Sequence, residues 1–253
     1  MNAFKLFDAY SLRARLFPAL WASASVIAAI ALIVPWHRFS IFHAIGSVAV
    51  PVVLFAMADL ARRIGKIKEP KLYERWGGMP TTNMMRHADS TLDAATKAAY
   101  VGFVAGKLNS SPPTAAEEVA SPDKADAFYS RCAAWLRENT RDVKKFTILF
   151  NENVTYGYRR NLFALKWPAL AIDLLILFGT AVYMFHARHD LASELGVKLL
   201  ILVVIAVIHA AYMAFASTEA SVREAANIYA RQLLLSCDSL ESAVQTKRRN
   251  KAG

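Results

Sequence analysis

The chain has 253 residues, of which 55% are hydrophobic and only 20% are charged, and its formal net charge is +10. An ordinary soluble domain is about 45–50% apolar and about 25% charged, and the apolar excess here falls in four blocks, so the composition excludes an ordinary soluble protein and a disordered chain. The two cysteines, Cys132 and Cys237, allow neither a disulfide framework nor a zinc site built on Cys/His spacing.

Each of the four apolar blocks is long enough for a membrane-spanning helix, which needs about 20 apolar residues. They cover residues 17–35, 41–60, 165–185 and 199–215. The first block is too long for the apolar core of a signal peptide, and a second block follows closely, so we expect it to be retained. The predicted fold class is all-α: a polytopic membrane protein with four transmembrane helices in two hairpins and a helical cytosolic domain.

Lysine and arginine are distributed unevenly between the connecting segments. Residues 61–162 include 17 of them, whereas the turn after the first block has only Arg38. Because basic loops stay in the cytoplasm, both termini and the central segment are expected there, with the protein in a bacterial inner membrane. The predicted domains are a cytosolic N-terminal segment (1–16), transmembrane hairpin 1 (17–60), a cytosolic helical domain (61–162), transmembrane hairpin 2 (163–217), and a cytosolic C-terminal helix with a basic tail (218–253).

Two long helices are predicted in the central segment. One is capped by Thr81 or Thr82 and covers about 83–108. The other starts near Asp123 and ends before Gly157, and a polar loop lies between the two. The tail helix, 218–246, repeats apolar residues at intervals of three and four, close to a heptad seam. This seam could pack against the same chain or form a coiled coil with another subunit.

Asp173 and His209 are the ionisable residues that lie deepest in the predicted spans. They fall at similar depth in an antiparallel hairpin, and an ionisable group in hydrocarbon is costly unless it finds a partner inside the bundle. We therefore predict an intramembrane polar pair. It could belong to an ion or proton path, act as a latch, or only fix the register of two helices.

Two further sets of residues could bind anions. A turn before the first cytosolic helix could direct amides, hydroxyls and arginines at a phosphate, although a capped turn without a ligand explains the same pattern; its residues are Arg75, Gly77, Gly78, Thr81, Thr82 and Arg86. A juxtamembrane basic set could contact anionic headgroups or act only as the orientation signal; it consists of Arg62, Arg63, Lys66, Lys68, Arg159 and Arg160. No motif predicts a catalytic residue, a metal site or a cofactor.

Two short stretches of the sequence are Trp76-Gly77-Gly78-Met79-Pro80-Thr81-Thr82 and Asn153-Val154-Thr155-Tyr156-Gly157-Tyr158-Arg159-Arg160-Asn161-Leu162. Both resemble patterns in uncharacterised bacterial inner-membrane proteins with four spans and a cytosolic insert. This layout is similar to four-helix membrane effectors of nucleotide-signalling anti-phage systems, in which a cytosolic region senses a signal and the membrane part oligomerises and disrupts the bilayer. The resemblance implies antiviral defence and a nucleotide signal or cytosolic protein partner, and it assigns no functional residue.

The expected function is therefore that of a non-enzymatic membrane effector or sensor, in contact with the lipid bilayer and assembled as a homo-oligomer. The alternatives are a constitutive ion channel or transporter subunit, and a scaffold that anchors a cytosolic partner. Specific nucleic-acid binding is not predicted, because membrane proximity explains the basic charge and no nucleic-acid-binding module is recognisable.

Overall fold

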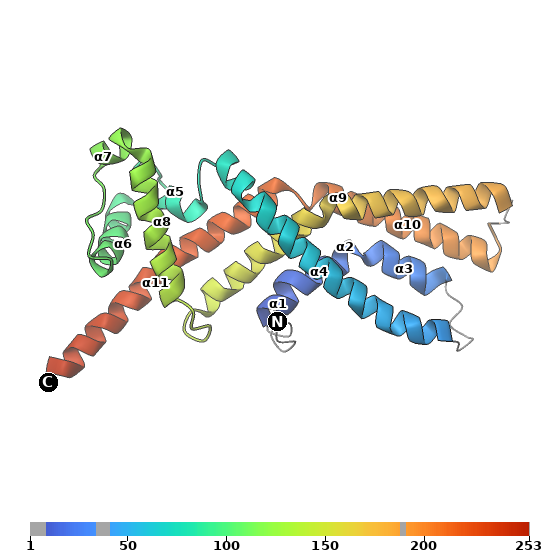
Figure 1. Cartoon of the computed structure of the whole chain (residues 1–253), viewed down its shortest axis with the longest axis horizontal. Helices are drawn as coiled ribbons and strands as arrows, with labels where there is room; N and C mark the ends of the chain where they lie inside the picture. The colour runs from blue at the N-terminus through green and yellow to red at the C-terminus, as the bar shows by residue number, and fades with distance from the viewer. Residues whose placement is uncertain (1–8, 34–40, 188–190, 253) are drawn as a thin grey trace. The chain divides into compact units, whose positions relative to one another are not determined.

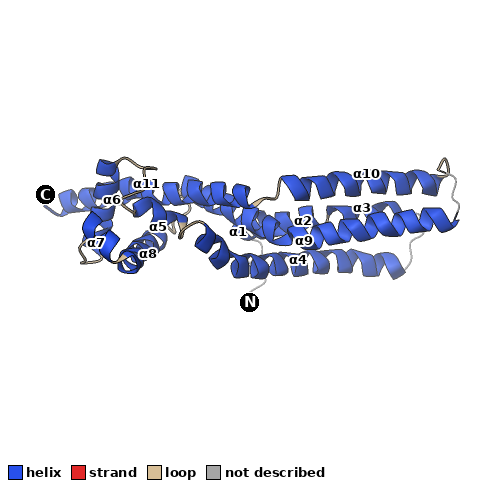
Figure 2. Cartoon of the chain, turned by 90° about the horizontal axis from the view of Figure 1, so that it is seen from above, coloured by secondary structure: helices blue, strands red, loops and turns tan. Residues whose placement is uncertain are grey.

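The computed structural model describes residues 9–33, 41–187 and 191–252, with residues 9, 41–50, 53, 187 and 243–252 described by their backbone only. Within these ranges every regular element is a helix and none is a strand, which confirms the all-α class (Figure 2). The chain divides into two compact units, Met1–Glu69 with Gly157–Val222 and Pro70–Tyr156 with Arg223–Gly253.

The first unit includes the apolar helices (Figure 1). Its N-terminal segment consists of α1 (Ala9–Ser11), a π-helical turn η2 (Leu12–Leu16), α2 (Phe17–Ala22) and α3 (Ala24–Ile33). Most of α4 (Ile41–Arg75) and α9 (Thr147–Ala187), and all of α10 (Glu194–Phe215), also belong to it. The end of α3, the start of α4, the end of α9 and the start of α10 lie at one end of the unit (Figures 1 and 2), as two helical hairpins require.

Two helices, α9 and α10, are long and apolar enough to cross a membrane. A third candidate is the bent pair Leu12–Ala22 with Ala24–Ile33, whose halves meet at 55°. The predicted span at 41–60 falls largely on residues whose side chains lie outside the described part, so two to three candidate spans are shown and the fourth stays a prediction.

Small side chains dominate the core of the first unit. Ala19 and Ala22 of α2, Ala58 and Ala61 of α4, and Ala169 of α9 are all 0–8% exposed and belong to one cluster. Such residues let helix backbones approach closely, which is the main source of packing energy between helices in lipid. Ala19 and Ala22 of the first apolar block therefore serve close helix packing.

The second unit is a group of helices around a separate apolar core. α5 (Pro80–Met85), α6 (Ala94–Lys107) and α7 (Ala115–Ala120) each pack against α8 (Pro122–Asn139). Residues of α11 (Glu219–Ala252) join the same core, where Leu233 contacts a cluster that includes Tyr129, Cys132 and Leu136, all 0–1% exposed. The tail is thus helical as predicted and packs against its own chain, while a coiled coil with another subunit stays a prediction.

The prediction of one continuous helix over 83–108 is wrong, because the structure has two helices there. α5 ends at Met85, because Arg86 takes an extended backbone, and α6 starts afresh at residue 94. The carboxylate of Asp93 accepts a hydrogen bond from the Thr96 amide at 2.9 Å, which gives α6 its own N-cap. The local capping contact therefore starts a new helix, although the periodicity of the apolar residues predicts a continuous one.

The second predicted helix, from near Asp123 to just before Gly157, is also interrupted in the structure. α8 ends at Asn139, where the side chains of Asn139 and Thr140 bond back to carbonyls of the preceding turn at 2.9 and 2.8 Å. Such bonds compete with further helical turns. α9 then begins at residue 147 and continues through Gly157. A Cβ at Gly157 would lie only 3.0 Å from the Cβ of Ala14. Glycine at this position serves close packing and is no helix stop.

Candidate functional site

Asp173 and His209 meet inside the first unit. Asp173 lies on α9 and His209 on α10, and their side chains are only 1% and 5% exposed. Nδ1 of His209 lies 2.9 and 2.8 Å from the two carboxyl oxygens of Asp173. The structure therefore brings together the two ionisable residues that the sequence places deepest in the predicted spans.

The second ring nitrogen of His209 reaches the interrupted N-terminal helix. α2 ends at Ala22, and Ser23 leaves the helical conformation with φ −101° and ψ 5°. Carbonyls in the last turn of a helix need partners from outside it, and the Trp21 carbonyl oxygen lies 2.8 Å from Nε2 of His209. One imidazole thus connects three segments: α2, α9 and α10.

These contacts fix the proton count of the pair. A carbonyl oxygen can only accept, so Nε2 of His209 has the hydrogen and donates it to Trp21. Nδ1 then shares a single proton with Asp173, either as an imidazolium that donates to a carboxylate or as a neutral imidazole that accepts from a carboxylic acid. In both forms the pair is neutral overall.

A second buried polar side chain supports the same N-terminal segment. In a regular helix the residue four positions after Ala14 would donate to its carbonyl, but that residue is Pro18, which has no N–H. Asn161 of α9, only 1% exposed, donates from Nδ2 to the Ala14 carbonyl oxygen at 2.7 Å. The irregular N-terminal helix is therefore held at two carbonyls, Ala14 and Trp21, by side chains from two other helices.

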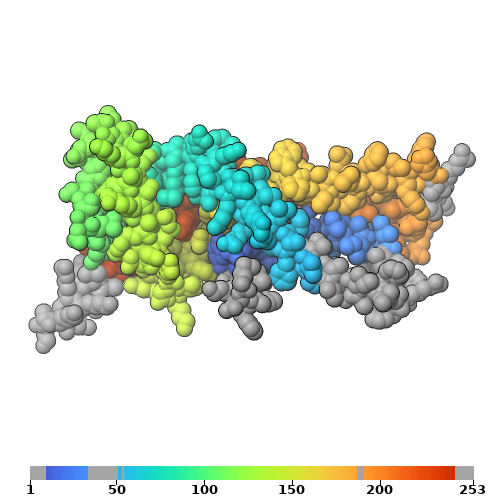
Figure 3. Space-filling view, in the orientation of Figure 1, coloured from blue at the N-terminus to red at the C-terminus, as the bar shows by residue number. Residues whose placement is uncertain are grey.

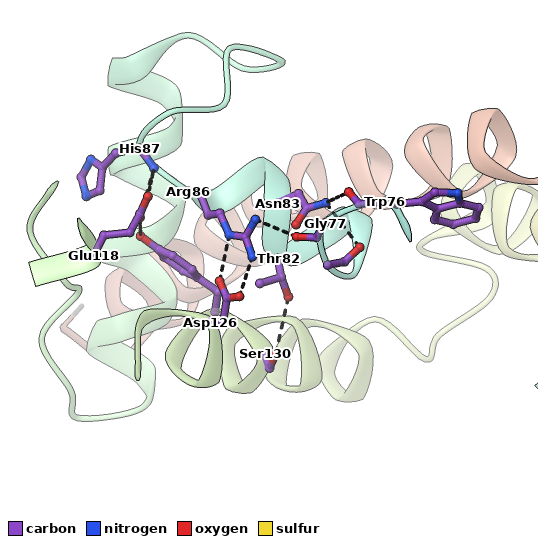
Figure 4. A network of polar contacts seen from close by, with 11 residues as sticks. Trp76, Gly77, Thr82, Asn83, Arg86, His87, Glu118, Asp126 and Ser130 are labelled. Atoms are coloured by element: carbon purple, nitrogen blue, oxygen red, sulfur yellow. Dashed lines mark hydrogen bonds and ion pairs between the residues drawn. The ribbon is translucent and has the colours of Figure 1, made fainter. Parts of the chain in front are cut away.

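In the second unit, Arg86 is engaged on all sides of its guanidinium (Figure 4). Nε and Nη2 donate to the two carboxylate oxygens of Asp126 at 2.9 and 2.5 Å, and Nη1 donates to the Gly77 carbonyl at 2.8 Å. The hydrogen bond to Asp126 raises the pKa of Arg86 above its usual value. The bidentate pair joins the end of α5 to α8, and the bond to Gly77 connects both to the turn after α4.

The turn itself presents carbonyl oxygens to side-chain donors. Asn83 donates from Nδ2 to the carbonyls of Trp76 and Gly78 at 3.1 and 3.3 Å, and Gly78 and Gly77 have positive φ values of 131° and 75°. The N-cap of α5 is Met79, so the expected threonine cap is wrong. Thr81 and Thr82 are buried, Thr82 lies 3.5 Å from the Ser130 hydroxyl, and Arg75 is exposed. These contacts give the turn a structural role, and anion binding there stays a prediction.

The juxtamembrane basic residues occupy different environments. Arg63 pairs with Asp59 at 2.7 Å, and Arg160 pairs with Glu69 at 2.8 Å. The ammonium of Lys68 lies over an aromatic ring, 5.2 Å from its centre. Those that form no ion pair with a described residue are Arg62, Lys66 and Arg159.

Sequence reasoning missed four partners in these networks. The Trp21 carbonyl and the Ala14 carbonyl are backbone atoms, and only Pro18 inside the first apolar block signals that a helical donor is absent. Asn161 gives only a weak signal, because it directly follows Arg159 and Arg160 at the polar edge of the third apolar block. Asp126 gives no local signal, because its partner Arg86 lies 40 residues away.

Known proteins give no further guide to the site. Comparison of the chain with protein-family models, curated proteins and solved structures finds no match. Among the described residues, no group of three or more His, Cys, Asp and Glu side chains could hold a metal ion. The functional argument therefore rests on the chain's own geometry.

Proposed function

We propose that the protein is a non-enzymatic inner-membrane effector or sensor with four spans, cytoplasmic termini and a cytosolic helical region, assembled as a homo-oligomer. The exposed side chains of α9 and α10 support the membrane location. Leu174, Leu175 and Phe178 of α9 are 66–68% exposed, and Ile208 of α10 is 64% exposed. Contiguous apolar surface of this extent is unfavourable in water and favourable in lipid.

The observation that supports a switching role is the Asp173–His209 pair together with the Trp21 carbonyl. Ionisable residues inside membrane helices are rare and usually functional, and here one pair also closes a helix break. A signal that separated α10 from α2 would break the bond to Trp21 and open the contact between these two helices. We therefore assign the pair the role of a latch that keeps the membrane part closed at rest.

The signal would reach the cytosolic helices first. α9 extends without interruption from residues of the second unit to residues of the first, which is the element that a transmitted movement needs. A cytosolic protein partner or a small signalling molecule, such as a nucleotide, would supply the trigger. Antiviral defence is the biological setting that the layout suggests.

Flux through liposomes tests this function. Wild-type protein reconstituted into dye-loaded liposomes should be tight at rest and leak when cell extract or cyclic nucleotides are added on the side of the cytosolic region. Asp173→Leu, which removes the latch, should leak without any addition. Ile208→Ala, a change on the exposed face of α10, is the matched control and should behave as wild type.

The alternatives give different results in the same assay. A constitutive channel would conduct in the wild type at rest, and Asp173→Asn would abolish that conduction. A scaffold would show no flux in any variant and would retain a partner protein during purification. Wild-type liposomes that stay tight under every addition, together with a tight Asp173→Leu variant, would rule out the effector function.

A further inference from the structure

A small cavity lies between the N-terminal helical segment and α4, both within the first unit. Its volume is about 120 Å³. Figure 3 shows the N-terminal segment, in dark blue, against α4, in light blue. The residues that line the cavity and matter here are Arg15, Leu16, Phe55, Ala58, Asp59 and Arg62.

The cavity has an excess of positive charge. Arg15 and Arg62 are half-buried, and neither forms an ion pair with any described residue. The guanidinium of Arg15 lies over the ring of Tyr10, 5.6 Å from its centre, a contact that leaves its charge without a carboxylate. Asp59 also lines the cavity, but its carboxylate is paired with Arg63 at 2.7 Å, on the more exposed side of α4. Two arginines therefore face the cavity without a carboxylate of their own. Arginine binds phosphate oxygens well because its planar group offers parallel donors.

The cavity also has a polar end and an apolar end. The lining residues of α4 share one face of the helix, because they are spaced three, one and three residues apart. They are Phe55, Ala58, Asp59 and Arg62. Phe55 lies about 10 Å along the helix from Arg62 at 1.5 Å per residue, in the direction of the predicted span. A ligand with an anionic head and a hydrocarbon tail matches this order of charge and apolar surface.

We infer that this cavity is a binding site for the headgroup of an anionic phospholipid, with the phosphate between Arg15 and Arg62 and the acyl chains beside Phe55. The volume suits a glycerol phosphate group but not the chains, which would continue along the exposed apolar surface. The inference rests on the membrane location in the proposed function. It requires no flux, so its failure and that of the effector function are seen in separate measurements.

Native mass spectrometry of the full chain in neutral detergent tests the site. The probes are phosphatidylglycerol and phosphatidylcholine with identical acyl chains. An arginine close to an anionic headgroup contributes about fivefold in affinity. With two arginines, the wild type should retain phosphatidylglycerol about 25-fold more strongly than phosphatidylcholine. Arg15→Gln/Arg62→Gln should lose this preference.

Two controls make the result specific. Arg13→Gln/Lys66→Gln removes the same charge from exposed positions nearby and should keep the preference. Asp59→Asn removes the negative group of the cavity and should strengthen the preference, a gain that misfolding cannot imitate. Equal retention of both lipids by the wild type, or a preference that survives in Arg15→Gln/Arg62→Gln, would overturn the site. Displacement of the lipid by excess glycerol phosphate would show a phosphate site and equally overturn the lipid proposal.

Discussion

At the scale of single residues, His209 holds partners on two other helices. Replacement by alanine leaves the Asp173 carboxyl group and the Trp21 carbonyl buried without their partner. Removal of one member of a buried pair costs about 3–5 kcal/mol. We expect His209→Ala to lower the thermal unfolding midpoint in detergent by roughly 10 °C, measured by circular dichroism.

Two further variants separate the hydrogen bond from the shared proton. In Asp173→Asn the side-chain amide can donate to Nδ1 of a neutral His209, so its midpoint should stay near that of the wild type. Ile208→Ala, on the exposed face of the same helix, should also change little. A His209→Ala midpoint no lower than that of Ile208→Ala would show that the pair contributes nothing to stability.

Asn161 and Pro18 form a second residue-scale relationship, because the asparagine supplies the donor that the proline lacks. Asn161→Ala should cost about 1–3 kcal/mol, the usual penalty for a buried polar group left unpaired. Pro18→Ala restores a backbone N–H that can donate to the Ala14 carbonyl. The cost of Asn161→Ala should therefore be smaller in the Pro18→Ala background. Chemical unfolding of the four proteins gives the coupling free energy, and additive costs within about 0.5 kcal/mol would refute the compensation.

At the scale of elements, two helical glycines should respond to alanine in opposite ways. A Cβ on Gly102 of α6 would meet no atom within 4 Å, whereas a Cβ on Gly65 of α4 would lie 2.9 Å from Oδ1 of the buried Asn161. Alanine is favoured over glycine inside a helix by about 0.5–1 kcal/mol. Gly102→Ala should therefore raise the free energy of unfolding by about that amount, and Gly65→Ala should lower it. Equal gains from both changes in a denaturant titration would contradict the close approach at Gly65.

The sequence predicted the long helices of the first unit well and the shorter ones less well, for a physical reason. The third and fourth apolar blocks lie wholly within α9 and α10, so their composition was enough to predict helix there. The breaks at Arg86 and Asn139 depend on side chains that bond to Asp126 or back to the chain itself. Periodicity contains no information about such contacts, which is why both cytosolic helices were predicted too long.

The candidate site shows the same division. Asp173 and His209 could be paired from the sequence because the depth of a residue in a helical hairpin can be counted in residues from the end of its span. Their third partner, the Trp21 carbonyl, could not, because it depends on how the bent N-terminal segment packs against α10. Arg86 was identified as a potential anion ligand, but its actual partner, Asp126, becomes visible only when α8 is placed beside the turn.

At the scale of the whole molecule, neither of the two native cysteines should react with a thiol-labelling reagent at neutral pH. Cys132 and Cys237 are each 0% exposed, and burial raises their pKa values to about 11 and about 12. Only the thiolate reacts with maleimides. Because a raised pKa keeps the thiol protonated, its reactivity at pH 7 should be very low and should increase only as the pH approaches these values. Label on a single-cysteine-insertion variant can therefore be attributed to the introduced cysteine.

The arrangement of the chain across the membrane is then open to a direct test. Ser90, in the loop before α6, and Ala192, before α10, are both exposed. In spheroplasts, an impermeant maleimide should label Ala192→Cys from outside, because the positive-inside pattern places the hairpin turns there. Ser90→Cys should be labelled only after the membrane is permeabilised, whereas the wild type should stay unlabelled in both states. Labelling of Ser90→Cys in sealed spheroplasts would invert or abolish the proposed topology, and with it the assignment of the second unit as the part that receives a cytosolic signal.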